Sequence, residues 1–161
     1  MAKRSKKHDD TPTFQNRKAR HDYEIVDTLE VGIKLSGSEV KAIRDGLASI
    51  AEGFVTVKES PKHALTLHGV HIGVYPAAGP IQHTPVHDRT LLAHKREIEK
   101  LARQIDQKGM TIVPLKMYFQ QGLIKVTIGV ARGRAAHDKR RAIAERESER
   151  ELKRAMSRID R

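Results

Sequence analysis

Five segments between residues 23 and 131 are short, rich in Val, Ile, Leu and Thr, and partly alternate between apolar and polar side chains. They begin at Tyr23, Gly53, His63, Met110 and Gly122. This pattern predicts strands of a sheet that is buried on one face. The tripeptide QQG at residues 120–122, between the last two segments, predicts a hairpin.

Two other segments have helical patterns. In the first, residues 36–46, Ser36 and Glu39 have capping-box spacing, and Gly46 is placed to end the helix. The second covers residues 91–109, where apolar residues recur at three-, four- and seven-residue intervals. Those residues are Leu91, Ile98, Leu101 and Ile105.

Many short strands with few helices predict a mainly β fold. We expect a small OB-like antiparallel barrel of about six strands with two or three short helices. A ferredoxin-like sandwich is the alternative, and it should show a more regular alternation of helices and strands. The 161 residues leave room for one core. The chain then divides into a disordered basic arm at residues 1–15, the OB-like barrel at 16–131 and a basic tail at 132–161.

The charge distribution favours a polyanionic partner. The chain has a net charge of +11. Residues 1–21 hold seven Lys and Arg against two Asp and Glu, residues 22–131 hold thirteen against twelve, and residues 132–161 hold eleven against six. Basic ends indicate nucleic acid, with an anionic membrane surface as the alternative. No apolar run is long enough to span a membrane, and the N-terminus lacks a signal peptide, so we expect a cytoplasmic protein.

The tail is made mostly of helix formers, yet it has no apolar residue larger than alanine between Ile143 and Leu152. A helix would align four arginines spaced by four into one basic stripe. They are Arg146, Arg150, Arg154 and Arg158. Like charges at this spacing oppose each other by about 0.2–0.5 kcal/mol per pair. We expect a tail that is disordered or frays when free and becomes an ordered helix when phosphates line up along the stripe. The alternative is a helix docked on the barrel through Leu152, Met156 and Ile159.

Catalytic and metal motifs are absent from the sequence. The nine histidines show no paired-ligand spacing and there is no cysteine, so we expect no metal. There is no P-loop, no GxGxxG and no GxSxG motif, so we expect neither cofactor nor enzyme activity. His21, Asp22 and His137 supply the acid and base of a basic ribonuclease, which remains an alternative.

The strongest candidate RNA site is NRKARHDY, residues 16–23. Its basic residues can reach phosphates, Asn16 and His21 can bond to sugars or base edges, and Tyr23 offers a ring for stacking. The basic residues are Arg17, Lys18 and Arg20. We expect this cluster to adjoin Lys41 and Arg44 on the first predicted helix.

Four motifs in order resemble the SsrA-binding protein family, also called small protein B, over residues 16–161. They are NRKARHDY, EVGIKLSGSEVKAIRDGLASI, KGMTIVPLKMYF and GLIKVTIGVARGRAAHDKR. The resemblance implies a six-stranded OB-like barrel that binds the tRNA-like domain of transfer-messenger RNA and brings it to ribosomes stalled on messages without a stop codon. It also implies a monomeric adaptor for trans-translation that meets elongation factor Tu indirectly, through the aminoacylated RNA. A structural protein present on every ribosome is the remaining alternative.

The resemblance also assigns residues by position. It places Asn16, Arg17, Lys18, Arg20, His21, Glu30, Lys41, Arg44, Leu92 and Lys125 against the tRNA-like domain. It places Gly133, His137, Asp138, Lys139 and Arg140 in the ribosomal decoding centre and the vacant message channel, and we add Arg146, Arg150, Arg154, Met156 and Arg158 from the helix pattern. Residues 83–93 depart from the family pattern, because only Arg89 is basic there.

Overall fold

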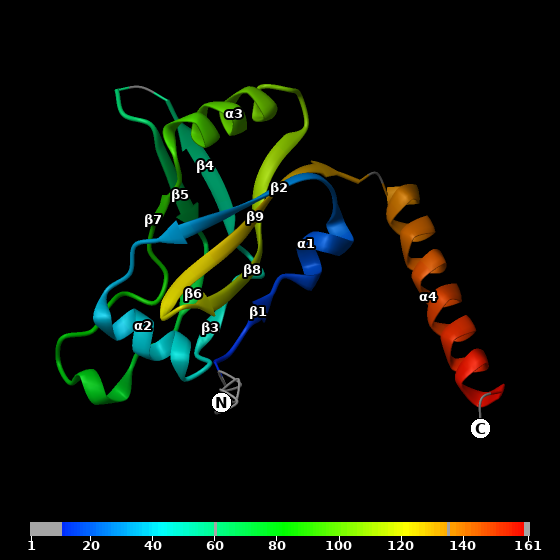
Figure 1. The fold of residues 1–161 in the computed structure, drawn as a ribbon, viewed down its shortest axis with the longest axis horizontal. Helices are drawn as coiled ribbons and strands as arrows, with labels where there is room; N and C mark the ends of the chain where they lie inside the picture. The colour runs from blue at the N-terminus through cyan, green and yellow to red at the C-terminus, as the bar shows by residue number, and fades with distance from the viewer. Residues whose placement is uncertain (1–10, 60, 135, 160–161) are drawn as a thin grey trace, which may run out of the picture.

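The computed structural model describes residues 11–59, 61–134 and 136–159, and it shows a β-barrel from which a long helix extends (Figure 1). Six antiparallel strands close into a ring in the order β8, β4, β5, β7, β2, β9 and back to β8. The predicted mainly β, six-stranded barrel is therefore confirmed, and the ferredoxin-like alternative is wrong.

The ring strands are β2 (Tyr23–Ile33), β4 (Phe54–Lys58), β5 (Ala64–His68), β7 (Arg89–Leu92), β8 (Met110–Gln120) and β9 (Leu123–Gly133). Outside the ring, β1 (Phe14–Gln15) pairs with β8, and β3 (Ala48–Ser49) pairs with β6 (His71–Ile72). The helices are α1 (Arg17–Asp22), α2 (Gly37–Arg44), the short 3₁₀ helix η1 (Pro76–Ala78), α3 (Lys95–Ile105) and α4 (Ala136–Ile159).

The predicted hairpin joins β8 to β9. Gln121 and Gly122 both have positive φ, 50° and 77°, as a tight turn between twisted strands requires. At the ends away from the hairpin, β8 and β9 are buried on both faces. This burial explains the nearly continuous apolar sequence there. Ile112 belongs to the main core of the barrel, whereas Val113 packs in a second, smaller cluster with Ala19 of α1.

The helix at residues 36–46 forms as predicted. Ser36 Oγ accepts from the backbone N–H of Glu39, and the Glu39 carboxylate accepts from the backbone N–H of Ser36. Gly46 follows the helix with a φ of 80°. Capping and one buried face therefore determine α2 locally.

The predicted start of the second helix is wrong, because α3 begins at Lys95 and residues 89–92 form β7. Leu91 lies opposite Leu65 on one side and Ile33 on the other, and it is buried in the barrel core. Pairing with β5 and β2 therefore outweighs the helical spacing of this leucine. From Ile98 onward the predicted apolar face is correct, with Ile98 and Leu101 buried.

Two further strand boundaries differ from expectation. The segment from His63 divides into β5 and β6, because Gly69 between them has a φ of 70° and turns the chain. Phe14 and Gln15, which we assigned to the disordered arm, pair with Met117 and Lys116 of β8. The barrel therefore takes up two residues before Asn16, while residues 1–10 of the predicted arm lie outside the described part of the chain.

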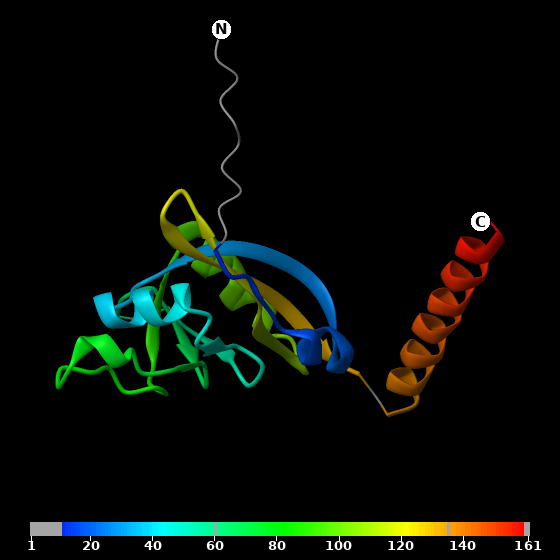
Figure 2. The same ribbon diagram turned by 90° about the horizontal axis from the view of Figure 1, so that it is seen from below.

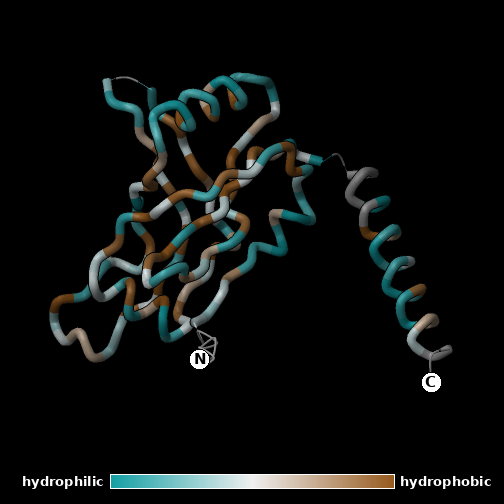
Figure 3. The backbone as a smooth tube through the Cα atoms, in the orientation of Figure 1, coloured by the Kyte–Doolittle hydropathy of each residue, from teal (hydrophilic) through white to brown (hydrophobic). Residues whose placement is uncertain are grey.

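The tail forms α4, a helix of 24 residues that extends away from the barrel (Figure 2). Most of the residues that Figure 3 colours along α4 are hydrophilic. Leu152 and Met156 are each 60 % exposed, so the alternative in which they dock the helix on the barrel is wrong. The side chain of Ile159, also part of that alternative, lies outside the described residues. A hydrogen bond from Arg146 Nη2 to the carbonyl oxygen of Arg20, at 2.9 Å, joins α4 to α1.

Candidate nucleic-acid interface

Asn16 anchors the basic cluster to the barrel. It is only 1 % exposed, and its Oδ1 accepts from the Ala19 backbone N–H at 2.9 Å, capping α1. Its Nδ2 donates to the carbonyl oxygens of Ile50 and Pro114, at 3.1 and 2.9 Å. Our expectation that Asn16 offers its amide to sugar or base edges does not fit this burial, because the amide is used to hold α1 in place.

The cations of α1 differ in their availability. Arg17 and Arg20 are exposed. Lys18 donates from Nζ to Glu52 Oε1 at 2.7 Å, and this hydrogen bond raises the pKa of Lys18. Phosphate would therefore compete with Glu52 for Lys18. His21 is half-buried, and its Nδ1 lies 2.8 Å from Asp22 Oδ1.

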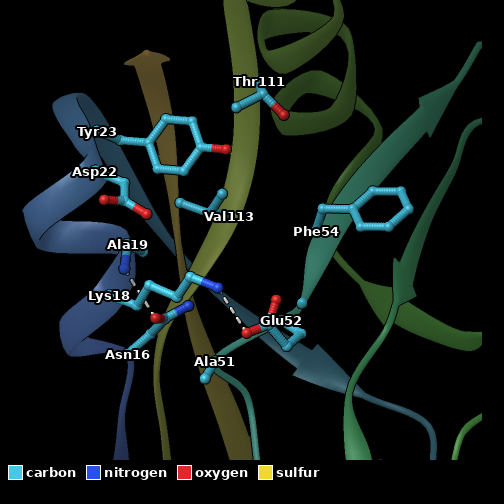
Figure 4. Close-up of a pocket in the computed structure, with 11 residues that line it drawn as sticks. Asn16, Lys18, Ala19, Asp22, Tyr23, Ala51, Glu52, Phe54, Thr111 and Val113 are labelled. Carbon is cyan, nitrogen blue, oxygen red and sulfur yellow. Dashed lines mark hydrogen bonds and ion pairs between the residues drawn. The ribbon is translucent and has the colours of Figure 1, made fainter. Parts of the chain in front are cut away.

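A pocket of about 310 Å³ lies beside α1. Lys18, Asp22 and Tyr23 line the α1 side, with the Tyr23 ring extending into the pocket, and Glu52 and Phe54 line the opposite side (Figure 4). Tyr23 also packs on the small apolar cluster beneath α1, which fixes its ring. The pocket thus joins one cation, two carboxylates and two aromatic side chains.

A second group of predicted residues meets on the outer surface of β7, β2 and β9. Leu92 and Lys125 both pair with Gly32, one from each neighbouring strand. Leu92 is 55 % exposed. Glu30 lies two residues before Gly32 and therefore on the same surface. Glu30, Leu92 and Lys125 therefore share one surface, a register that could not be read from the sequence alone.

Tyr118 and Lys116 of β8 complete this outer patch, which we define as Glu30, Leu92, Lys116, Tyr118 and Lys125. The Tyr118 hydroxyl donates to Glu30 Oε2. Lys116 Nζ lies 4.7 Å from the centroid of the Tyr118 ring, and Tyr118 pairs with Lys125 across the hairpin. Tyr118 thus orients the Glu30 carboxylate, and lysines on either side lower the electrostatic cost of bringing RNA close to it.

Lys41 and Arg44 project from α2 and are exposed. Lys41 Nζ lies 5.5 Å from the centroid of the Tyr75 ring, and the Arg44 guanidinium carbon lies 5.7 Å from that of Phe119. We expected these cations to adjoin α1, but α1 and α2 lie far apart at opposite ends of β2 (Figures 1 and 2). The chain between them forms an eleven-residue strand, so closeness in sequence did not become closeness in space.

Arg89, the basic residue of the segment 83–93 that departs from the family pattern, begins β7 at the end of a loop, and it is 2 % exposed and does not face solvent. Its Nε donates to Glu39 Oε1 at 2.7 Å, and Nη1 donates to the Val70 carbonyl oxygen at 2.7 Å. Burial favours the neutral form of Glu39, but hydrogen bonds from Ser36, Arg89 and His87 outweigh it and lower the pKa of Glu39 to about 2. Arg89 therefore fastens the loop to α2.

The tail residues are only partly described. Gly133 ends β9, and Arg140, Arg146, Arg150, Arg154 and Met156 are exposed on α4. The side chains of His137, Asp138, Lys139 and Arg158 lie outside the described residues. All four arginines of the predicted stripe lie within α4, so their four-residue spacing is on a continuous helix, as the stripe requires.

Within residues 11–59, 61–134 and 136–159 no group of three or more His, Asp or Glu side chains could hold a metal ion. In the same described part, no helix is both long and apolar enough to cross a membrane.

The sequence model of the SmpB protein family matches residues 13–158. The chain belongs to the SmpB family. The match covers the barrel, α1 and almost all of α4. It therefore includes both the cluster on α1 and the outer patch.

Curated SmpB relatives match over most of their length. An SsrA-binding protein of Parasynechococcus marenigrum (strain WH8102) is 48 % identical over 145 residues, covering 89 % of this chain and 86 % of the relative. An SsrA-binding protein of Ligilactobacillus salivarius (strain UCC118) is 44 % identical over 156 residues, or 97 % of each chain.

A solved SmpB-related chain has the same fold. It comes from the structure "tmRNA-SmpB: a journey to the center of the bacterial ribosome" and is 41 % identical, with a TM-score of 0.64. The match covers 78 % of this chain and 86 % of the solved one. That structure is of a protein with transfer-messenger RNA and the ribosome.

Three neighbours of the predicted site were missed by sequence reasoning. Glu52 pairs with Lys18 from 34 residues away, which no local pattern indicates. The positions of Tyr118 and Lys116 could have been predicted from the QQG hairpin, because counting back from it places Tyr118 opposite Lys125. The missing information was that β2 pairs with β9, which brings Glu30 to the same surface.

Proposed function

We propose that this protein is an RNA-binding adaptor of trans-translation. It binds the tRNA-like domain of transfer-messenger RNA and delivers it to ribosomes stalled on messages that lack a stop codon. The observation that carries the proposal is the likeness, at 41 % identity and over most of both chains, to a protein solved with transfer-messenger RNA on the ribosome. The names of the curated relatives, SsrA-binding proteins, support the same partner.

The α1 cluster and the outer patch together form the proposed contact with the tRNA-like domain. Arg17 and Arg20 supply exposed cations at one end of β2, and the half-buried Lys125 supplies a cation on the outer patch. The α1 cluster lies just before the start of β2, whereas Glu30 of the outer patch lies toward the other end of that strand. Two surfaces at different points along β2 suit a folded RNA, which can contact both, better than a single extended strand. Lys41 and Arg44 extend the contact beyond the other end of β2.

We assign the tail to ribosomal RNA. The arginine spacing of α4 and its projection from the barrel favour a helix that enters the decoding centre and the message channel when no message fills them. Selection of stalled ribosomes would then be steric, with the charged stripe held by phosphates.

The proposed role includes no chemical step by the protein. We infer that it acts as a monomer, binds no cofactor, and meets elongation factor Tu through the aminoacylated RNA. A partner on the ribosome favours a cytoplasmic location.

Two assays with the full-length protein test the proposal. In filter binding, the protein should bind a transcript of the tRNA-like domain more tightly than it binds an unrelated hairpin of equal length. Addition of the protein and transfer-messenger RNA to translation of a message without a stop codon should release tagged peptide. Failure to bind the transcript, or cleavage of it that is lost in His21→Ala, would count against the adaptor and favour the ribonuclease.

A further inference from the structure

We infer that Phe54 is a stacking platform for one unpaired nucleobase of the bound RNA, at the edge of the pocket beside α1. This inference rests on the proposed function, since it assigns a further contact to the same RNA. Phe54 belongs neither to the sequence motif of α1 nor to the outer patch.

The Phe54 side chain has the exposure and the supporting neighbour that stacking on a base requires. It lies on the outer surface of β4 and is 47 % exposed. Its ring stacks on His68 directly across from it on β5, with ring centroids 4.9 Å apart and an interplanar angle of 19°. One face of Phe54 is thus covered by His68, and the side chain keeps nearly half of its area for a partner.

Two polar side chains fix the supporting ring. His68 Nδ1 lies 2.7 Å from Asp88 Oδ1, and His68 Nε2 lies 2.7 Å from Thr56 Oγ1. With both ring nitrogens engaged, His68 holds its plane, and Phe54 is oriented before any ligand arrives. A pre-ordered ring loses little conformational entropy on binding.

The position of Phe54 indicates a base of the RNA at α1. Phe54 lies at the far edge of the pocket that Lys18 and Tyr23 also line, with its ring directed away from them (Figure 4). Lys58 follows Thr56 on the outer surface of β4 and is exposed, so one cation lies on each side of Phe54. Aromatic rings flanked by cations are the arrangement with which proteins hold unstacked bases next to their phosphates.

A tryptophan reporter tests the contact directly. The chain contains no tryptophan, so Phe54→Trp introduces a single emitter at the proposed platform. We expect quenching of its fluorescence when the tRNA-like transcript is added, because a base stacks on the indole. Ile81→Trp is the matched control, since Ile81 is 84 % exposed on a loop away from the pocket. Equal quenching of both reporters, or quenching of neither, overturns the inference.

Affinity measurements provide the second test. Phe54→Ala should weaken binding of the transcript about tenfold, within the range for loss of one base–aromatic stack. The slope of log K against log salt should not change, since stacking releases no counterions. Phe54→Tyr should restore affinity, and Ile81→Ala should match wild type. Wild-type affinity in Phe54→Ala overturns the inference, as does a loss that Phe54→Tyr fails to restore when both variants fold.

The source of the base is decided by titrating the Phe54→Trp protein with either the transcript or vacant ribosomes. Quenching by the transcript assigns the base to transfer-messenger RNA, and quenching by neither overturns the inference. Quenching by ribosomes alone would assign the base to the ribosome and overturn its placement in the RNA that is bound at α1. If wild type fails to bind the transcript at all, the proposed function fails; if wild type binds and Phe54→Ala binds equally, only the platform fails.

Discussion

At the scale of single residues, Asn16 links parts of the chain that are far apart in sequence. Its amide reaches Ile50 and Pro114, and its backbone N–H donates to the Leu115 carbonyl oxygen at 2.8 Å. Residues 114–116 are also where the pairing of β8 with β9 shifts register. Asn16 therefore satisfies carbonyl groups beside an irregularity of the barrel and starts α1 at the same time.

Replacing Asn16 by alanine should destabilise the fold by about 2–4 kcal/mol, because a helix cap is lost and two buried carbonyl groups lose a donor. Urea unfolding followed by circular dichroism measures this change. Arg17→Ala, an exposed neighbour, should change the free energy of unfolding by no more than about 0.5 kcal/mol. Equal effects of the two substitutions would contradict the anchoring role.

Glu39 should make stability depend on acid pH. Its pKa is lowered from 4.5 to about 2 in the folded protein, so its stabilising contribution is complete above about pH 4.5 and is lost as the pH falls through 2. The loss should be about 3 kcal/mol. The difference in unfolding free energy between wild type and Glu39→Gln should therefore shrink by that amount from pH 5 to pH 2.

The control for this pH effect is Glu147→Gln on the exposed face of α4, whose difference from wild type should stay constant. A difference for Glu39→Gln that is equally constant would show that the buried contact with Arg89 does not govern acid stability.

At the scale of elements, some helices and strands are determined by the local sequence and others by contacts with distant residues. The α2 helix could be predicted because Ser36, Glu39 and Gly46 carry its capping signals within eleven residues. The six-residue α1 could not, since so short a helix is unstable alone and depends on the cap from Asn16 and the burial of Ala19. Leu91 was misassigned for the same reason, because pairing partners 26 and 58 residues away make it a strand residue.

The candidate site was predictable in its residue types and less so in its geometry. Charge and aromatic content identified the segment from Arg17 to Tyr23, and the structure places it on one short helix and the start of β2. Its separation from Lys41 and the pairing of Lys18 with Glu52 follow from strand register and barrel closure, which a single sequence does not reveal.

Helix α1 should contribute to the salt dependence of RNA binding through its arginines. Arg17→Ala and Arg20→Ala should each reduce the slope of log K against log salt by up to about 0.9, the value for one lost phosphate contact. Lys18→Ala should reduce it less, because Glu52 already neutralises Lys18. Glu52→Gln should tighten binding by releasing that lysine. Filter binding at several salt concentrations measures all four variants.

The control for α1 is Lys108→Ala, an exposed cation between α3 and β8, which should leave both affinity and slope unchanged. An unaltered slope in both arginine variants would contradict direct phosphate contact by α1.

At the scale of the whole molecule, the two basic ends of the sequence have different structural roles. The described N-terminal cations, Arg17, Lys18 and Arg20, lie on α1, which is packed on the barrel through Ala19, whereas the C-terminal charge lies on α4, which has exposed side chains wherever they are described. The nearly neutral middle supplies the rigid frame and the outer patch. Such a layout allows one surface to stay bound to a folded RNA while the other explores a separate site.

Deletion of residues 136–161 should therefore separate the two roles. Ending the chain after residue 135 keeps the bond from the Arg134 N–H to the Asp22 carbonyl oxygen and removes that from Arg146 to Arg20. Loss of one exposed hydrogen bond should weaken binding of the tRNA-like transcript by no more than about fivefold. Peptide tagging on a message without a stop codon should be abolished, because the helix that would occupy the message channel is gone.

The same separation should appear without shortening the chain. Changing Arg146, Arg150 and Arg154 together to glutamine removes three charges of the stripe and keeps good helix formers, so tagging should fall sharply while transcript binding stays close to wild type. Changing the exposed Glu147 and Glu151 to glutamine is the matched control on the same helix, and it should leave tagging intact. Parallel loss of transcript binding and tagging in the arginine variant would mean that barrel and tail form one RNA site, since cations acting only in the message channel cannot affect the tRNA-like domain.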